Sequence, residues 1–143
     1  MSNNSNDTFN RPPPAKVPKL SGISAKLVTA YGAWHDVTRH IPKMRRYSLG
    51  VKIDTLFADI LELVALAQFS PVGDRPATIA RAITKNDILK TMLYVLLELK
   101  GIEEKYFIAL AERIEEIGRM LYGWKNQSLK QLSPVNRDLV NKQ

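Results

Sequence analysis

Cysteine is absent from the 143-residue sequence, and this absence excludes disulfides, thiolate metal sites and cysteine nucleophiles. Only two histidines occur, so a histidine-based metal site needs additional carboxylate ligands. No apolar run reaches the roughly 18 residues that a membrane-spanning helix needs. The first ten residues are rich in asparagine and serine and have neither a basic start nor an apolar core, so they do not resemble a signal peptide. We therefore expect a cytoplasmic protein.

Sequence signatures of catalysis and of phosphate-binding loops are also missing. Neither GxGxxG nor GxxxxGK[ST] occurs, and no serine stands in a recognisable catalytic pattern with a histidine and an acid. His35, Asp36 and His40 lie close together, but zinc needs three or four converging ligands and nothing else nearby qualifies. The clustered acids Glu112, Glu115 and Glu116 have Arg113 and Arg119 among them and indicate a solvated helix face. We expect no catalytic residues, no metal, no cofactor and no small-molecule substrate.

Basic residues outnumber acidic ones throughout the chain. The 21 lysines and arginines exceed the 14 acids and give a formal net charge of +7, which favours anionic partners. Residues 1–22 hold four asparagines, four prolines and three basic residues, a composition that buries too little apolar surface to order itself. We predict a flexible basic arm over residues 1–22 and a loosely held polar tail over residues 126–143.

Between these segments, apolar residues recur at the three- and four-residue spacing of amphipathic helices. The spacing predicts helices over residues 23–41, 42–69, 77–100 and 103–122, with the polar stretch 84–87 allowing a break in the third. Pro42 is expected to begin the second helix. A residue in the first turn of a helix has no intrahelical acceptor for its N–H, so proline, which lacks this group, is tolerated there. Gly101 is expected in the left-handed position that ends the third helix, and Gly123 is expected to end the fourth.

Four helices of this length joined by short turns predict an all-α, up-down-up-down four-helix bundle over residues 23–125. No stretch shows a period of two, so no sheet is expected. Residues 88–99 are apolar nearly all round the predicted helix, as in a helix that is buried on more than one side. This excess of apolar surface predicts self-association.

The densest cationic cluster surrounds the start of the predicted second helix. Arg39, Lys43, Arg45 and Arg46 fall within eight residues, with His40 and without an intervening acid. The last three stand at a helix N-terminus, where the helix dipole opposes a cation, and this placement indicates an anionic partner. Further candidate cations on the third helix are Arg75, Arg81, Lys85 and Lys90. The alternative for all of them is a solvated surface that is basic by composition.

Two separate stretches resemble one known family. Residues 41–50 read IPKMRRYSLG, followed by Lys52 and Ile53, and residues 116–124 read EIGRMLYGW. Both resemble motifs of the Avd family, the accessory variability determinants of diversity-generating retroelements. That family is related to four-helix proteins encoded in ribosomal RNA intervening sequences. Family members often have two glycines before the tryptophan, and Tyr122 replaces the first here. The matched positions, which are mainly structural, are Pro42, Leu49, Gly50, Gly118, Gly123 and Trp124.

The resemblance implies a non-catalytic accessory protein, encoded by a bacterium or phage, that forms a homopentamer of four-helix protomers. It also implies binding to a cognate reverse transcriptase and to RNA or DNA during mutagenic retrohoming, the error-prone copying of a template repeat. Gly50 and Gly118 are expected to permit close helix approach, and Trp124 to cover one end of the bundle. The alternative function is a self-assembling bundle of the ribosomal intervening-sequence type without a nucleic-acid role. A membrane-surface role ranks last, because the apolar stripes are needed for the core.

Overall fold

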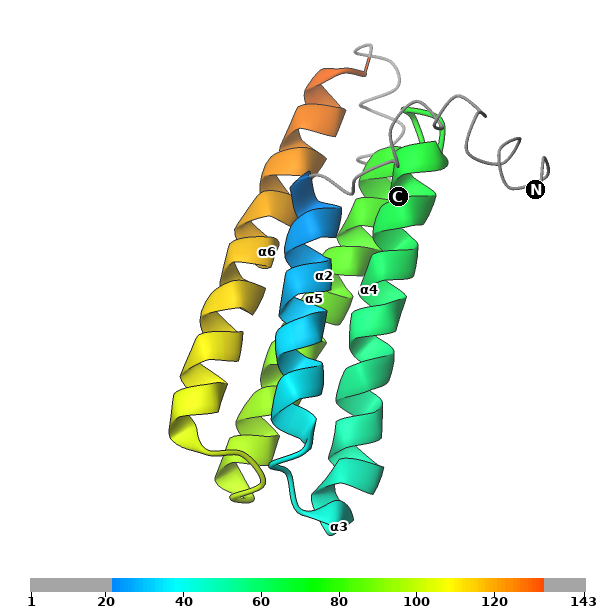
Figure 1. Ribbon diagram of the computed structural model, residues 1–143. Coiled ribbons are helices and arrows are strands. Elements are labelled where there is room, and N and C mark those ends of the chain that lie inside the picture. Colours follow the sequence, from blue (N-terminus) through cyan, green and yellow to red (C-terminus); the bar gives the residue numbers. More distant parts are fainter. Residues whose placement is uncertain (1–21, 133–143) are drawn as a thin grey trace, which may run out of the picture.

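The computed structural model describes residues 22–132, which form an antiparallel bundle of four long helices (Figure 1). These helices are α2 (Gly22–Thr38), α4 (Val51–Phe69), α5 (Arg75–Glu98) and α6 (Glu104–Lys130). A short helix α3 (Lys43–Arg45) and a wider π-helical turn η1 (Arg46–Gly50) lead into α4. Both α2 and α5 pack between α4 and α6, and no strand occurs within residues 22–132. The predicted all-α four-helix bundle is confirmed.

Each long helix turns one apolar stripe toward a shared core. The stripes predicted from three- and four-residue spacing supply the buried side chains, and Trp34 and Phe57 stack there with ring centroids 6.4 Å apart. Complete burial of such a side chain contributes about 1.5–3 kcal/mol relative to its exposure to water. The largest side chains that are almost fully buried include Leu27, Trp34, Ile53, Phe57, Ile60, Ile79, Leu89, Leu93, Leu96 and Leu110.

The first interhelical connection differs from its prediction by a few residues. Helix α2 ends at Thr38. The N–H groups of His40 and Ile41 then bond to carbonyl oxygens three residues earlier, whereas an α-helix spans four residues. Pro42 has ψ of 141°, so it precedes the first helical residue and does not begin the helix as predicted. Its carbonyl oxygen accepts the N–H groups of Arg45 and Arg46, each at 2.9 Å. Helix ends commonly shift by one or two residues in this way.

Helix α5 runs without interruption through residues 84–87, where the sequence allowed a break. The Thr84 hydroxyl donates to the carbonyl oxygen of Ala80 in its own helix at 3.2 Å and does not cap a new one. Asn86 is buried and donates to the carbonyl oxygen of Ile114 on α6 at 3.1 Å. Packing against α6 therefore outweighs the weak local signal for a helix end.

The turn from α5 to α6 places lysine where glycine was predicted. Lys100 has φ of 58°, in the left-handed region, and its N–H bonds to the carbonyl oxygen of Leu97 at 2.9 Å. The N–H of Gly101 bonds to the carbonyl oxygen of Leu96 at 2.8 Å, completing a Schellman motif. A Cβ on Gly101 would lie 2.4 Å from Leu96 Cδ1, so any other residue there would displace the buried Leu96 side chain.

Helix α6 continues beyond Gly123 to Lys130, so the prediction that Gly123 ends it is wrong. The inward stripe persists through Leu121, Trp124 and Ser128, and this packing outweighs the cost of about 1 kcal/mol that glycine carries within a helix. Residues 126–130, predicted as part of a loose tail, are consequently helical. The remaining predictions for the arm and the tail, at residues 1–21 and 133–143, lie outside the described residues.

Candidate nucleic-acid interface

Several segments that are distant in sequence meet at one end of the bundle, the lower end in Figure 1. The rings of His40, after α2, and Tyr106, in α6, stack with centroids 5.2 Å apart. A Cβ on Gly101 would lie 3.2 Å from Arg45 Cγ, so the Arg45 side chain rests against the α5–α6 loop. We call this region the basic end and define it by its cations: Arg39, Lys43, Arg45, Arg46 and Lys100.

A shallow cavity of about 370 Å³ lies between these segments. Its lining includes His40 and Pro42 from the first connection and Lys100 and Glu103 from the α5–α6 loop. The cavity confirms that the two connections are neighbours in space. Only antiparallel packing of α5 beside the other helices creates this neighbourhood.

Arg46 has an intramolecular role at the basic end. Its Nη2 donates to the carbonyl oxygen of Ile41 at 2.9 Å and to that of Arg39 at 3.4 Å. These carbonyls follow the C-terminus of α2, where the helix leaves acceptors unpaired and favours a cation. The sequence position of Arg46 indicates only the helix that follows it. Because Arg46 bonds to the turn that follows the preceding helix, its position is explained without an external anion.

Lys43, Arg45 and Lys100 are the cations of the basic end that have no such explanation. Lys43 and Lys100 are exposed and Arg45 is partly buried, and within residues 22–132 none of the three forms an ion pair. Arg39, by contrast, pairs with Asp36 at 3.6 Å, although both side chains are well exposed and the pair is weak. Sequence reasoning missed Lys100, because it stands alone among apolar and acidic neighbours in the sequence.

Exposed apolar side chains accompany these cations. Tyr47 is 70% exposed and Met44 is 78% exposed, and both flank Arg45 on the α3–η1 segment. An exposed aromatic ring beside unpaired cations is the combination that proteins use to bind single-stranded nucleic acid. The basic end therefore presents both electrostatic attraction for phosphates and a surface on which a base can stack.

The cations of α5 do not join the basic end. Lys85 Nζ lies 3.4 Å from Asp59 Oδ2 on α4, and Lys90 Nζ lies 2.9 Å from Glu115 Oε1 on α6. The hydrogen bond between Lys90 and Glu115 raises the pKa of the lysine and lowers the pKa of the glutamate. Their charges are thus largely compensated within the bundle. Arg81 is exposed and forms no ion pair within the described part of the chain.

Arg75 lies at the opposite end of the bundle and repeats the role of Arg46. Its Nε donates to the carbonyl oxygen of Ala67 at 3.0 Å, and its Nη2 donates to that of Ser70 at 3.2 Å. Both acceptors belong to the C-terminus of α4. The predicted candidates therefore separate into unpaired cations (Lys43, Arg45 and Arg81 within the described residues), ion-paired cations (Arg39, Lys85 and Lys90) and two arginines that bond to carbonyls at helix ends (Arg46 and Arg75).

The motif glycines have different surroundings. A Cβ on Gly118 would lie 3.2 Å from Asn86 Nδ2, so the expected close helix approach is found at this residue. A Cβ on Gly50 would meet the nearest atom at 3.5 Å, an ordinary contact, and one on Gly123 would meet nothing within 4 Å. Among these three glycines, only the one at position 118 has a neighbour that a Cβ would push aside, by a few tenths of an ångström.

The motif side chains Leu49 and Trp124 are partly buried and pack against the core from opposite ends of the bundle. Leu49 belongs to η1 beside the basic end. Trp124 belongs to α6 and shares a hollow with Gly22 and Arg75 at the other end. Trp124 thus lies at one end of the bundle, as expected, but does not close it.

Residues 22–132 contain neither a cluster of metal ligands nor a membrane-spanning helix. Within residues 22–132, no group of three or more histidine and acidic side chains is placed to hold a metal ion. His35 Nε2 lies 3.2 Å from Asp54 Oδ1, and the same carboxylate accepts a hydrogen bond from the Tyr31 hydroxyl at 2.9 Å. None of the helices in this range combines the length and the hydropathy needed to cross a membrane.

The chain matches no protein-family model and no curated protein. The family resemblance consequently rests on the motifs at residues 41–53 and 116–124, and the candidate interface rests on geometry and charge.

Proposed function

We propose that this protein is a non-catalytic accessory protein that binds nucleic acid and a reverse transcriptase to support mutagenic cDNA synthesis from a template repeat. The family resemblance supplies the reverse-transcription context. The observation that carries the nucleic-acid role is the gathering of Lys43, Arg45 and Lys100, unpaired within residues 22–132, at one end of a bundle.

Binding at the basic end follows from simple electrostatics. Lys43, Arg45 and Lys100 neutralise backbone phosphates and release condensed counterions, which requires no reading of base sequence. Each neutralised phosphate contributes about −0.7 to −0.9 to the slope of log affinity against log salt concentration. Affinity is therefore expected to fall steeply as salt rises.

We further propose that the protein assembles into a closed ring, a homopentamer by the resemblance. Among the described residues, 13 large apolar side chains are exposed, and contact between copies of the chain would cover part of this surface. Those on the long helices are Val28, Val51, Leu66, Phe69, Ile88, Tyr94, Val95, Ile108 and Tyr122. Five chains of charge +7 carry +35 (5 × 7), and the repeated basic ends add avidity. Light scattering that finds a monomer would contradict the ring.

The nucleic-acid role is tested by reversing Lys43 and Lys100 to glutamate in the full chain. Arg46 stays unchanged, because its loss would disturb the end of α2. The double reversal lowers the net charge from +7 to +3 (7 − 4). We expect binding of a labelled single-stranded RNA to weaken at least about tenfold at low salt, with a shallower salt slope. Circular dichroism and light scattering verify that helicity and oligomer size are retained.

The matched control reverses Arg81 and Arg113, which are also exposed and without ion pairs in the described chain. It changes the net charge by the same amount away from the basic end. An equal loss of affinity in both double variants would show attraction by net charge alone, and this would reject the basic end as the interface.

The polymerase contact needs a separate measurement. Immobilised protein is expected to retain the cognate reverse transcriptase after nuclease treatment, because the contact is between proteins. Loss of retention on nuclease treatment would show that nucleic acid alone bridges the two and would reject a direct contact.

The second candidate function is a self-assembling bundle without a nucleic-acid role. The exposed apolar side chains favour both candidates equally, because they bear on self-assembly and not on nucleic-acid binding. Salt-insensitive assembly with no measurable affinity for RNA or DNA would select it.

A further inference from the structure

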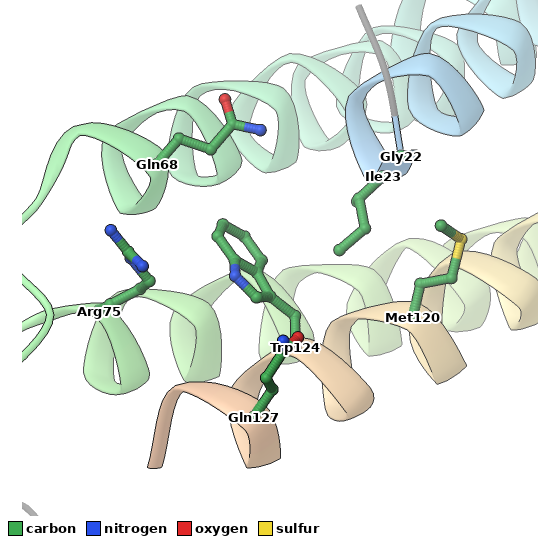
Figure 2. A pocket seen from close by; sticks show the side chains of 7 residues that line it. All are labelled: Gly22, Ile23, Gln68, Arg75, Met120, Trp124 and Gln127. Atoms are coloured by element: carbon green, nitrogen blue, oxygen red, sulfur yellow. The ribbon is translucent and has the colours of Figure 1, made fainter. Parts of the chain in front are cut away.

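A second hollow opens at the end of the bundle opposite the basic end. It lies where α2 and α5 begin and α4 ends, beside α6, and has a volume of about 550 Å³. This volume falls within the range of about 300–1,000 Å³ that is usual for small-molecule sites. The lining residues are Gly22, Ile23, Gln68, Arg75, Met120, Trp124 and Gln127 (Figure 2).

An aromatic ring and two aliphatic side chains form the apolar part of the hollow. Met120 and Trp124 are four residues apart on α6 and therefore share one face, and Ile23 joins them from α2. In the view of Figure 2, the indole stands between Arg75 and Ile23 and below Gln68. Trp124 is only partly buried, so the ring is available to a flat ligand.

The polar part of the hollow is a fixed cation with two carboxamides. The Arg75 guanidinium is held by its bonds to the carbonyl oxygens of Ala67 and Ser70, and no acid from residues 22–132 lines the hollow. Gln68 donates through Nε2 to Ser24 Oγ at 3.3 Å, which orients its amide, and Gln127 brings a second amide. The site thus offers an anchored positive charge, together with donors and acceptors beside an aromatic face.

We propose that this hollow binds one nucleotide unit, with the base on Trp124 and the phosphate toward Arg75. Bases stack on aromatic side chains, and glutamine amides pair with base edges. Arg75 Nε and Nη2 already bond to backbone carbonyls, so Arg75 acts on a phosphate through its fixed positive charge and not through a bidentate fork. This inference rests on the proposed nucleic-acid role and names the unit that is bound, at a surface separate from the basic end. The ligand is either a free nucleotide or one residue of a single strand.

Tryptophan fluorescence reports on Trp124, because the only other tryptophan, Trp34, is fully buried. It therefore distinguishes a free nucleotide from one residue of a single strand as the ligand. The full chain is titrated with adenosine monophosphate, a short oligoadenylate, a duplex of equal length and inorganic phosphate. Saturable quenching by the monophosphate identifies a free-nucleotide site. Quenching by the oligoadenylate alone identifies a unit within a strand. The duplex and inorganic phosphate are expected to leave the signal of Trp124 unchanged.

Variants separate this site from the basic end. Trp124→Leu is expected to weaken oligoadenylate binding about tenfold, and Trp124→Phe to retain most of the affinity, because stacking contributes about 1–3 kcal/mol per base. Arg75→Gln is compared with Arg81→Gln, which removes the same charge from the same helix, and only the first is expected to weaken binding. Thermal unfolding measures whether the Arg75 variant keeps the stability of the parent protein after losing the bonds to the C-terminus of α4.

Unchanged affinity in Trp124→Leu would overturn the inference, while loss of binding in the Lys43 and Lys100 reversal would still uphold the proposed function. Quenching by an acidic aromatic peptide of sequence EFE, without quenching by any nucleotide, would also overturn it and assign the hollow to a protein partner. If the parent protein binds no nucleic acid at any salt concentration, the proposed function fails. If the monophosphate also leaves the fluorescence of Trp124 unchanged, this inference fails as well.

Discussion

The side-chain nitrogen of Asn86 lies in tight contact with the position that a Cβ at residue 118 would take. Asn86 Nδ2 donates to the carbonyl oxygen of Ile114 at 3.1 Å and lies 3.2 Å from the position of a Cβ on Gly118. Asn86 is 3% exposed, so this hydrogen bond crosses a buried part of the α5–α6 contact. Sliding one helix along the other would leave the buried amide nitrogen without a partner, which is costly. Asn86 and Gly118 therefore specify the register of α5 and α6.

Alanine at position 118 is expected to behave differently from alanine at position 123. Gly123→Ala has free space and gains helix propensity, so it raises the free energy of unfolding by about 0.5–1 kcal/mol. Gly118→Ala forces the Asn86 amide aside and is expected to be about 1–2 kcal/mol less stable than Gly123→Ala. Urea unfolding measures both, and the difference should disappear in an Asn86→Ala background. Equal gains from the two alanines would contradict the assigned register.

The turn after α5 predicts opposite effects for two neighbouring substitutions. Lys100→Gly relieves a left-handed backbone and is expected to raise the free energy of unfolding by about 1 kcal/mol. Gly101→Ala places a Cβ against Leu96 and is expected to lower it by about 1–3 kcal/mol. Thermal and urea unfolding report both changes. A stabilised Lys100→Gly protein that binds RNA less tightly would also assign Lys100 to binding and not to folding.

Removing the Arg46 cap is expected to destabilise the protein. Arg46→Met leaves the carbonyl oxygen of Ile41 without its charged donor, and hydrogen bonds to charged groups contribute about 1.5–3 kcal/mol. Arg81→Met, at an exposed position, is expected to change the free energy of unfolding by no more than about 0.5 kcal/mol. If the two variants unfold at the same urea concentration, Arg46 has no capping role and returns to the set of candidate anion ligands.

The Tyr31 hydroxyl predicts a loss of stability at alkaline pH. Burial, followed by the hydrogen bond that the hydroxyl donates to Asp54, raises the pKa of Tyr31 above its ordinary value. Its contribution to stability is therefore complete below the unfolded-state pKa of about 10 and is lost as pH rises through the higher folded-state pKa. We expect the stability difference between the parent and Tyr31→Phe to shrink over that range in urea unfolding. A constant difference across the series would refute the linkage.

The sequence predicted the helices better than their ends. Spacing of apolar residues identified every long helix, because that spacing follows directly from 3.6 residues per turn. The helix ends predicted at Gly101 and Gly123 were wrong in detail. A glycine in the sequence is compatible with a turn, with a tight contact or with a helix interior, and its neighbours in sequence do not distinguish these. The tertiary structure distinguishes the three cases. Leu96 lies against Gly101, and α6 continues to pack beyond Gly123.

The sequence by itself determined an all-α bundle with a basic surface, since composition and periodicity are local properties of the chain. Tertiary structure alone decided which cations are unpaired. Arg46 and Arg75 turned out to hold helix ends, Lys85 and Lys90 to pair with acids on neighbouring helices, and Lys100 to join Lys43. The physical reason is that a charge is compensated by the atoms within a few ångströms of it. In an antiparallel bundle those atoms come from helices that are far apart in the sequence.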